Sequence, residues 1–536
     1  MSPKTKQISF LSALVVVVGT VIGAGIFFKN KFVISTTSTV NAGIAQANIG
    51  AAISAWIISA IGIIAIAVCL IELATATKND KGILAWVKNF TKKWMSRFAS
   101  SYMLIFYLPL TTLALSFFVV QAIQDASGNS FQLDGWVASA IAFGLFAWIA
   151  LTSFFSIKAA GILQWIFTIG GNALPLLIIP IIAFFNPGNS VDPNFVANSN
   201  LNQPTGLSQL FVGFGILAAI PSIMFSFDGF YTATALRSKL KDPNKLPSIM
   251  IVGLIIVTVL YLFLTIGFVI GSADGTSNGV FGTNIIPRWL QIILSSFIAL
   301  AVMSTLNGYA LSSAPIFKAT DEEKELHFIG WFKRVFKIKD QLTAAFLVFF
   351  AIVSISYLII IPVGLYAWQI GEVKTYGSAG LLYNFVDIIT NFASIMAYLF
   401  IGVSIHGALI NRKKNFVKVK KYKYFVPVAW IALIFVYISV VFFFIDSIVS
   451  IPLSNVQVFN DHVGIIDQVG SRTASLNNMV TAIVRLGFFI FSFAVCVGIT
   501  LIESWIEKKY YKNKSKPVIV DEVEELEKIS KKLINS

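Results

Sequence analysis

Long apolar runs separated by short basic segments fill most of this chain of 536 residues. About twenty apolar residues in a row suffice for a helix to cross a hydrocarbon layer of about 30 Å, and uninterrupted runs lack the alternation of a barrel strand. The pattern predicts an all-α integral membrane protein with twelve transmembrane helices. The predicted spans are 9–28, 49–74, 99–123, 135–155, 161–185, 208–236, 247–271, 289–317, 342–368, 380–410, 425–450 and 478–502.

Composition agrees with this prediction. Hydrophobic residues make up 57% of the chain and charged residues 12%, whereas soluble domains have about 25% charged residues. A soluble enzyme, a disordered chain and a nucleic-acid-binding protein are excluded, despite a net charge of +15. Cys69 and Cys496 lie in separate apolar runs, and no two of the three histidines have metal-ligand spacing. We therefore expect no metal and no cofactor.

The basic residues predict the orientation in the membrane. Of the 40 lysines and arginines, 34 lie in tails and loops on one side of the predicted spans, and five lie on the other side, among them Lys29 and Lys31. Under the positive-inside rule the richer side is cytoplasmic. We expect a multi-pass protein of the plasma membrane with both termini in the cytoplasm and with the lipid bilayer as its surroundings.

The first span is interrupted by glycines. Gly19, Gly23 and Gly25 lie within seven residues at mid-membrane, and glycine weakens a helix. Unpaired backbone groups are tolerated in lipid only where protein or a ligand satisfies them, so the break predicts a cavity. A packing face of small residues is the alternative.

The sixth span favours the cavity, because it contains a proline, a glycine and an acidic residue: Pro221, Gly229 and Asp228. Helices broken at corresponding places in two five-helix halves indicate a transporter site built from inverted repeats. Half-helix ends offer N–H groups to an anion and carbonyls to a cation, which suits a zwitterion. The predicted parts are a tail 1–8, repeats 9–185 and 208–410, peripheral helices 425–502, and a charged tail 503–536.

These residues resemble the amino acid-polyamine-organocation superfamily of permeases. The first span matches its pattern G-x-x-I-G-x-G-I-F between 19 and 27, and further matches lie at 72–76 (E-L-A-T-A), 225–230 (F-S-F-D-G-F), 241–247 (K-D-P-N-K-L-P) and 304–308 (S-T-L-N-G). The resemblance implies the leucine-transporter fold, with five plus five inverted helices, two peripheral helices, and discontinuous helices 1 and 6. It also implies transport of an amino acid by alternating access.

The resemblance implies a substrate site at the two breaks. Backbone around Gly23 would bind the substrate carboxylate, backbone of 225–227 would accept from its ammonium, and Phe230 or Tyr231 would occlude the site. The substrate-binding candidates are Ile22, Gly23, Ala24, Gly25, Phe225, Ser226, Phe227, Asp228, Gly229, Phe230 and Tyr231.

Five charged residues fall inside the predicted spans, and such residues are functional candidates. Glu72 is expected to pair with Lys78 in a structural or gating role, with proton relay as the alternative, and Asp446 is expected to reach the headgroups. Arg485 is expected to pair with a neighbouring helix or a lipid phosphate. Asp387 is a gate, a substrate contact or a packed polar residue.

Asp228 has three interpretations. It pairs with a cationic substrate, carries the coupling proton, or caps the broken helix. The family often has a lysine in the fifth span in place of sodium, and this chain has Gly171 at the aligned position. Ser312 and Ser313 offer hydroxyls for a sodium site.

We therefore expect a secondary active amino acid permease, working by proton-coupled symport or exchange, and no enzyme activity. A sodium-coupled symporter of amino acids or polyamines is the alternative, and a channel or substrate sensor is the alternative from another class. No phosphate-binding loop of the form G-x-x-x-x-G-K-[ST] is present in the sequence, so an ATP-driven pump is excluded within the chain.

Overall fold

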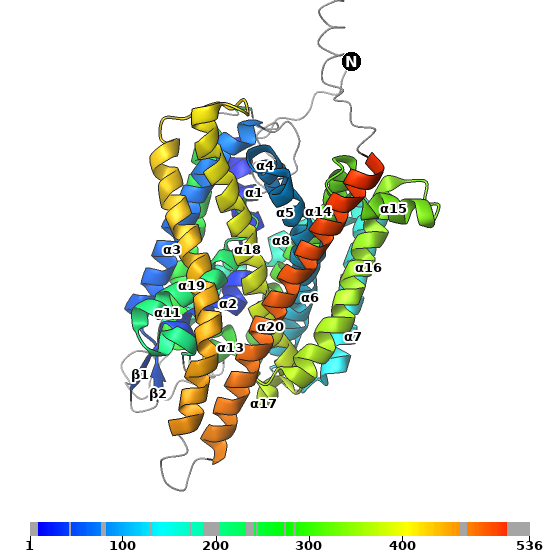
Figure 1. The fold of residues 1–536 in the computed structure, drawn as a ribbon. Helices are drawn as coiled ribbons and strands as arrows, with labels where there is room; N and C mark the ends of the chain where they lie inside the picture. Colours follow the sequence, from blue (N-terminus) through cyan, green and yellow to red (C-terminus); the bar gives the residue numbers. More distant parts are fainter. Residues whose placement is uncertain are drawn as a thin grey trace, which may run out of the picture.

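The computed structural model describes residues 9–41, 44–76, 82–128, 131–171, 173–185, 204–231, 241–242, 245–272, 275–281, 286–460 and 469–511. These residues form a helix bundle, and most of its helices run along the long axis of the bundle (Figure 1). The strands in this part of the chain are β1 (Thr39–Asn41) and β2 (Ile44–Gln46), which pair antiparallel with Val40 opposite Ala45. The predicted all-α architecture is therefore confirmed for the described residues, apart from this short ribbon.

Nine helical segments in the described ranges are long and apolar enough to cross a membrane. They agree with nine of the predicted spans, and the count of twelve stays a prediction. Their helices are α3 (Ile49–Leu73), α5 (Lys93–Tyr102) continued by η2 (Met103–Tyr107) and α6 (Leu108–Ala126), α7 (Gly135–Phe155), α12 (Leu246–Gly271), α14 (Arg288–Glu322), α16 (Gln341–Pro362) continued by η6 (Val363–Ala367), α18 (Ala379–Lys414), α19 (Phe425–Asn460) and α20 (Val469–Ile506).

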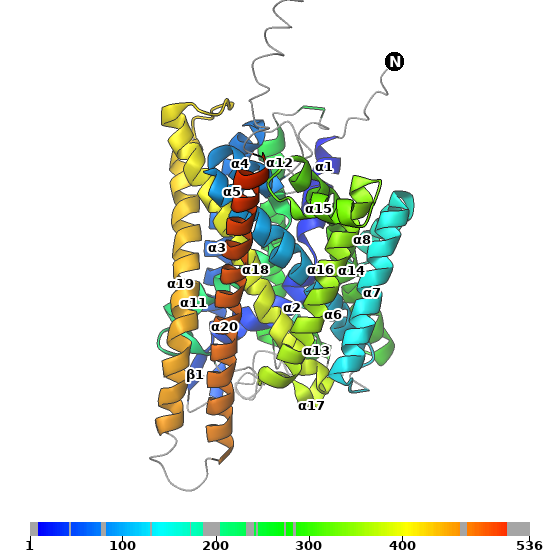
Figure 2. The same cartoon turned by 45° about the vertical axis from the view of Figure 1, so that its right-hand side comes forward.

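The other three predicted spans correspond to shorter helices. The first is divided into α1 (Phe10–Val21) and α2 (Ala24–Thr36), and the fifth into α8 (Ile157–Gly171) and α9 (Ala173–Phe184). The sixth contains α11 (Val212–Ser226), which ends before Asp228. Figures 1 and 2 show α1 in the half of the bundle near α4 (Gly82–Phe90), and α2 in the half near β1 and β2. The first break therefore lies near mid-height.

The predicted end of the first span at residue 28 is wrong. α2 continues to Thr36, so Lys29 and Lys31 lie in a helix rather than in an outer loop. Lys29 is fully buried. A window of apolar residues ends at the first lysine, whereas the helix continues because carboxylates of other segments pair with both lysines.

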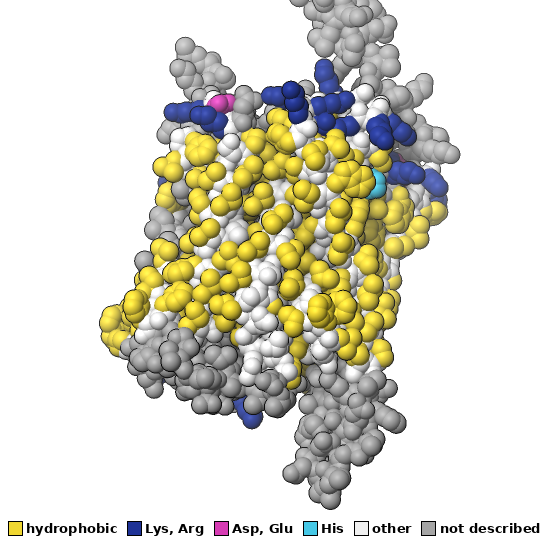
Figure 3. Space-filling model, turned by 90° about the vertical axis from the view of Figure 1, so that its left-hand side faces the viewer, with side chains coloured by type: hydrophobic (Ala, Val, Ile, Leu, Met, Phe, Trp, Pro, Cys, Tyr) yellow, Lys and Arg dark blue, Asp and Glu magenta, His cyan; other side chains and the backbone are white. Residues whose placement is uncertain are grey.

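Short helices cover the two ends of the bundle. α4 and α15 (Phe328–Val335) lie at one end, and α13 (Ser277–Phe281) and α17 (Val373–Tyr376) lie towards the other (Figures 1 and 2). The short helix η3 (Gly206–Gln209) packs against α11 and α19. Figure 3 shows hydrophobic side chains over one flank, with lysines and arginines gathered at one end of it. This separation is what a hydrocarbon layer with one basic, water-facing surface requires.

Glycines bring several helices into backbone contact. A Cβ atom on Gly171 of α8 would overlap the backbone of Ala301 in α14, with the carbonyl carbon of Leu300 2.7 Å away. Between α12 and α9, a Cβ on Gly271 would lie 2.7 Å from the Cα of Ala183. Small residues at helix interfaces are the usual means of close packing in membranes, where the hydrophobic effect does not drive helix association.

We predict that Gly171→Ala destabilises the protein by about 1–3 kcal/mol, because the added methyl group meets backbone that cannot rotate away. Gly161→Ala is the matched control on the same helix, since a Cβ there has no atom of another segment within 4 Å. The measurement is the thermal unfolding midpoint of both variants purified in detergent. Equal midpoints for the two variants would contradict the packing contact between α8 and α14.

Candidate functional site

The two interrupted helices meet near the middle of the bundle. α1 ends at Val21, α2 begins at Ala24, and α11 ends at Ser226. A Cβ atom on Gly25 would overlap the Cα atom of Ser226 and lie 2.9 Å from its Oγ atom. A side chain at Gly25 would therefore separate the two breaks, and glycine holds them together.

Tyr261 of α12 bonds to both breaks. Its hydroxyl lies 3.1 Å from the carbonyl oxygen of Val21 and 3.0 Å from that of Ser226. Its ring packs edge-on against Trp56 and Phe227. The last carbonyls of a helix lack intrahelical partners, and lipid supplies none. One buried hydroxyl therefore serves the ends of both α1 and α11.

The first turn of α2 offers N–H groups at the break. Among the described residues no side chain caps this helix, and its first N–H groups have no partner within the helix. They carry a positive partial charge that suits an anion such as a carboxylate. Ile22, Gly23 and Gly25, all predicted site residues, are buried here. Ala24 begins the helix, and its side chain lies outside the described part.

The end of α11 turns sharply after Ser226. The N–H of Phe227 donates to the carbonyl of Ile223 at 3.1 Å, and that of Asp228 to the carbonyl of Phe225 at 3.0 Å. Gly229 follows with a φ of +92°, a value that side chains disfavour. The predicted break at Gly229 is therefore present. Binding of an ammonium group by the carbonyls of 225–227 stays a prediction.

Asp228 lies in a cage of hydroxyl groups from three other elements. Its Oδ2 atom accepts from the hydroxyl of Tyr107 at 2.5 Å. Tyr309 and Ser394 lie 3.3 and 3.5 Å away, and Tyr107 in turn lies 2.7 Å from the hydroxyl of Tyr231. Within the described ranges no lysine, arginine or histidine lies within ion-pair distance of Asp228. Among the described residues, the carboxylate is therefore solvated by neutral donors.

The cage contains residues that sequence analysis missed. Tyr107 ends a single π-helical turn, Met103–Tyr107, that interrupts the α5–α6 segment, and such turns are frequent at functional sites. Tyr309 comes from α14 and Ser394 from α18. No spacing rule connects these positions, and an isolated tyrosine or serine in an apolar run gives no signal. Asp228 also accepts from the N–H of Gly229 at 2.9 Å, and its predicted role as a helix cap stays a prediction.

Aromatic rings surround the break on both sides. Phe230 is fully buried and packs on Tyr231 and Tyr398. The ring of Phe225 lies below the ammonium group of Lys29, with 4.9 Å between the nitrogen and the ring centre. The predicted residues Phe225, Phe227 and Phe230 are thus gathered at the site. Occlusion of a substrate by Phe230 or Tyr231 stays a prediction.

A buried ion pair lies near the break, on the α2 side of it. The Nζ atom of Lys29 is 2.7 Å from Oδ1 of Asp387, and it also donates to the Asp387 carbonyl at 2.5 Å and to Oγ1 of Thr390 at 2.6 Å. The pair joins α2 to α18. Sequence analysis named Asp387 and treated Lys29 as a loop charge, because the partner lies 358 positions away.

A cavity of about 380 Å³ adjoins this pair, with residues of α2, α6, α18 and α20 in its wall. Asp387, Phe118 and Tyr383 are part of its wall, and Lys31 and Glu372, which also form an ion pair, are another part. Its volume falls within the range of about 300–1,000 Å³ of small-molecule sites. We call this cavity the vestibule.

Glu72 lies at the other end of the bundle. Its carboxylate accepts from the guanidinium of Arg412 at 2.5 and 3.0 Å and from the N–H of Tyr422 at 2.9 Å. Glu72 is 1% exposed, and the fork of two parallel bonds is the strong form of this pair. Lys78, its predicted partner, lies outside the described residues. Arg412 was missed because it comes from the distant α18.

The residues predicted to take part in ion coupling, Ser312, Ser313 and the position of Gly171, do not form one cluster. Ser312 is exposed, Ser313 is buried, and both donate to carbonyls of their own helix. The backbone of Ala301 leaves no room for a side chain at Gly171. Between α8 and α14 lies instead a neutral network, in which Gln164 donates to Ser304 at 2.7 Å and accepts from Asn307 at 2.7 Å. A sodium site at the two serines stays a prediction.

No group of three or more His, Cys, Asp or Glu side chains in the part of the chain that the structure describes is placed to hold a metal ion.

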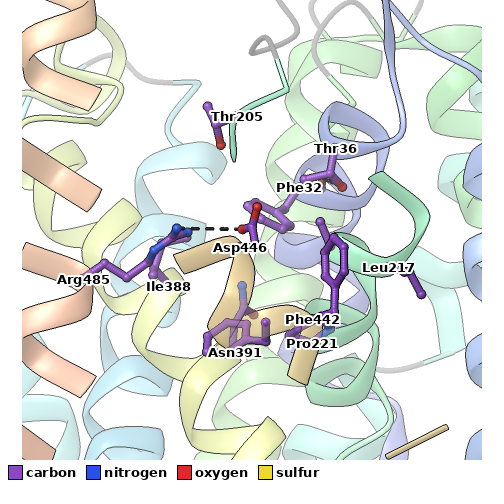
Figure 4. A pocket seen from close by; sticks show the side chains of 12 residues that line it. Phe32, Thr36, Thr205, Leu217, Pro221, Ile388, Asn391, Phe442, Asp446 and Arg485 are labelled. Atoms are coloured by element: carbon purple, nitrogen blue, oxygen red, sulfur yellow. Dashed lines mark hydrogen bonds and ion pairs between the residues drawn. The ribbon is translucent and has the colours of Figure 1, made fainter. Parts of the chain in front are cut away.

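Arg485 and Asp446 face each other between α20 and α19 (Figure 4), with 3.8 Å between NH2 and Oδ2. The expected pairing of Arg485 with a neighbouring helix is therefore observed. The expectation that Asp446 reaches the headgroups is wrong, because its carboxylate points into the protein and accepts from the N–H of Leu207 at 2.8 Å.

Two lysine–carboxylate pairs beside the vestibule, one buried and one partly exposed, give a matched prediction. Asp387→Asn leaves buried Lys29 without its counter-charge, which costs on the order of 3 kcal/mol. Glu372→Gln removes the partner of Lys31, but Glu372 is 41% exposed, so we expect a loss below about 1 kcal/mol. The measurement is the unfolding midpoint of each purified variant. A smaller shift for Asp387→Asn than for Glu372→Gln would contradict the buried pair.

Comparison with known proteins gives several matches. Residues 8–460 match the family model described as amino acid permease. The chain is 26% identical to an uncharacterized protein of Mycoplasma pneumoniae, over 96% of both chains. It is 24% identical to the serine/threonine exchanger SteT of Bacillus subtilis, over 60% of this chain and 70% of that one. With the b(0,+)-type amino acid transporter 1 of Mus musculus it shares 23% identity, over 79% and 80%.

Among solved structures, the chain is similar to MhsT crystallised with L-phenylalanine. The TM-score is 0.50 at 14% identity, over 82% of this chain and 99% of that one, so the similarity concerns the fold. The inverted arrangement of two five-helix repeats stays a prediction. The family match covers most of the chain, and the relatives with named functions are transporters. The chain therefore belongs to the amino acid permease family, as a multi-pass membrane protein and a transporter rather than an enzyme.

Proposed function

We propose that this protein carries an amino acid across the plasma membrane by alternating access, by proton-coupled symport or by exchange. The substrate binds between the break of the first span and the end of α11. The observation that carries the proposal is the contact of these two breaks at Gly25 and Ser226, with both held by Tyr261. Interrupted helices that meet at mid-membrane are typical of transporter sites.

The central site matches a zwitterion. The substrate carboxylate binds the free N–H groups of the first turn of α2, where the partial positive charge of the helix lies. The ammonium group faces the end of α11 and Asp228. These groups come from two helices that move relative to each other in alternating access. A ligand bound to both helices therefore stabilises the conformation in which the two lie close together.

Asp228 determines whether a proton is co-transported with the amino acid or whether the amino acid itself is cationic. An intramembrane carboxylate without a cationic partner is costly, and the hydroxyl cage offsets part of that cost through hydrogen bonds. The remainder is offset by a proton or by the cationic side chain of a substrate. Proton coupling and uptake of cationic amino acids are both supported by this environment. Sodium coupling through Ser312 and Ser313 is the alternative.

Ion pairs on the two sides act as gates. Lys29 and Asp387 join α2 to α18 above the site, and Glu72 and Arg412 join α3 to α18 at the other end. Breaking each pair is required before the helices that it joins can separate. With the basic end in the cytoplasm, the vestibule faces outward and both termini are cytoplasmic.

Counterflow tests the proposal. Proteoliposomes loaded with unlabelled L-serine, L-leucine or L-lysine are expected to accumulate the same labelled amino acid transiently above equilibrium, because a carrier exchanges one molecule for another. Gly25→Ala is expected to abolish the signal by displacing Ser226, and Gly161→Ala to retain it. Equilibration without overshoot would indicate a pore, and no flux with any of the three would indicate a sensor.

The role of Asp228 is tested with Asp228→Asn. Asparagine caps a helix as well as aspartate does, so the variant removes the charge and keeps the cap. If Asp228 pairs with a cationic substrate, we expect at least a tenfold loss of L-lysine uptake relative to L-leucine uptake. If it carries the coupling proton, we expect an uptake rate that no longer depends on pH. The measurement is initial uptake into proteoliposomes between pH 5 and pH 8. Unchanged pH dependence and an unchanged lysine-to-leucine ratio would leave Asp228 only the capping role.

A further inference from the structure

The helix α15 and the four residues after it contain aromatic and basic residues in close succession. Residues 331–339 read W-F-K-R-V-F-K-I-K, and they lie in the connection between α14 and α16. Figure 1 shows α15 projecting from the side of the bundle, beside the upper end of α16 and at the same end as α4. We call residues 331–339 the basic segment.

One side of α15 is fixed to the bundle. Ile329 is fully buried, and Asp321 of α14 accepts from the N–H of Gly330 at 3.0 Å. At the start of the helix, the backbone nitrogen and Nδ1 of His327 lie 2.9 and 2.7 Å from the carboxylate of Glu503 in α20. These contacts hold α15 in one orientation, and that orientation determines which of its side chains face outward.

Three large apolar side chains of the basic segment face away from the bundle. Trp331 is 58% exposed, Val335 52% and Phe336 61%. Trp331 and Val335 are four residues apart and therefore share one face of the helix, and Phe336 packs on Phe332 with 4.5 Å between ring centres. An exposed apolar face with basic neighbours is typical of helices that lie in the membrane–water interface, where tryptophan is enriched.

The cations of the basic segment have no acidic partner within ion-pair distance. Four of them form no ion pair with any described residue: Lys333, Arg334, Lys337 and Lys339. The acidic residues just before α15 are engaged elsewhere, because Glu323 and Glu325 lie 3.1 and 3.6 Å from Lys88 of α4. The basic segment is therefore left with positive charge that an external anion can neutralise.

Lys337 occupies a backbone position that usually belongs to glycine. Its φ is +52°, and α15 ends there in a Schellman motif. The N–H of Ile338 donates to the carbonyl of Lys333 at 3.0 Å, and the N–H of Lys337 donates to the carbonyl of Arg334 at 3.3 Å. A side chain destabilises this conformation relative to glycine. A lysine at this position therefore favours a role for its charge outside the fold.

We propose that the basic segment binds the headgroups of anionic phospholipids, with Trp331, Val335 and Phe336 in the adjoining acyl layer. Each lysine or arginine near an anionic membrane surface strengthens binding about fivefold, and four of them directly before a membrane-spanning helix match the pattern of lipid-binding segments. The ligand is a lipid rather than a soluble phosphate, because the exposed apolar side chains require an apolar partner. The inference does not depend on which amino acid is carried, since α15 lies apart from the two breaks.

Depth in the membrane is the first test. Cys69 and Cys496 are buried, so a fluorophore that reacts with thiols labels the new cysteine of Val335→Cys selectively. In nanodiscs, we expect brominated phospholipid to quench this label and aqueous iodide to leave it bright. Glu322→Cys, at an exposed position at the end of α14, is the control with the reverse behaviour. Quenching of the label at 335 by iodide would place it in water, and quenching by neither agent would place it under another part of the chain. Either result would overturn the proposal.

Lipid selectivity is the second test. The unfolding midpoint of the full chain in detergent is measured with phosphatidylglycerol, phosphatidylcholine or glycerol phosphate, and we expect phosphatidylglycerol alone to raise it. The concentration that gives half of this rise is expected to increase at least tenfold in the variant Lys333→Gln/Arg334→Gln/Lys337→Gln/Lys339→Gln. It is expected to stay unchanged in a control that loses the same charge from another exposed loop: Lys413→Gln/Lys414→Gln/Lys418→Gln/Lys423→Gln. Midpoints without lipid show whether each variant is folded.

Three results of this second test would contradict the site. An equal loss in both variants would assign the effect to net charge, and a rise with glycerol phosphate would assign the site to soluble phosphates. No rise with phosphatidylglycerol in the wild type would exclude anionic lipid as the ligand. Each of these results leaves the proposed transport function untouched, because counterflow tests that function separately.

Discussion

The bond of one buried hydroxyl to two helix ends organises this protein. Tyr261 serves the last residues of α1 and α11, and in a hydrocarbon environment those carbonyls have no water to bond. The close approach at Gly25 and the ring contacts of Tyr261 with Trp56 and Phe227 fix the two ends in place. The first N–H groups of α2 have no partner within their helix, and the proposed function assigns them to the substrate carboxylate.

The second constraint is that a buried charged side chain needs partners, and the three buried carboxylates along the bundle have different ones. Among the described residues, Glu72 has a bidentate arginine, Asp387 a lysine that makes further bonds, and Asp228 hydroxyl groups and the N–H of Gly229. The first two arrangements join helices and suit gates. The third leaves a carboxylate ready for a proton or a cation.

Much of the architecture could be predicted from the chain, because a helix that faces lipid must be apolar along its length. Nine predicted spans agree with long helices, and the breaks near Gly23 and Gly229 are observed. The end of the first span was wrong because Lys29 is a charge that only a distant carboxylate explains. Asp228 was recognised from its depth. Its partners Tyr107, Tyr309 and Ser394 were missed, because isolated polar residues in apolar runs carry no pairing information.

The sequence by itself determined the class of protein, the separation of basic and apolar segments, the interrupted helices and the family resemblance. These follow from hydropathy and glycine spacing, which are properties of neighbouring residues. Only the tertiary structure decided which charges meet: Lys29 with Asp387, Glu72 with Arg412, and Arg485 loosely with Asp446. Each partner lies on another segment. Such pairs depend on how helices pack, and helix packing is a property of the whole bundle.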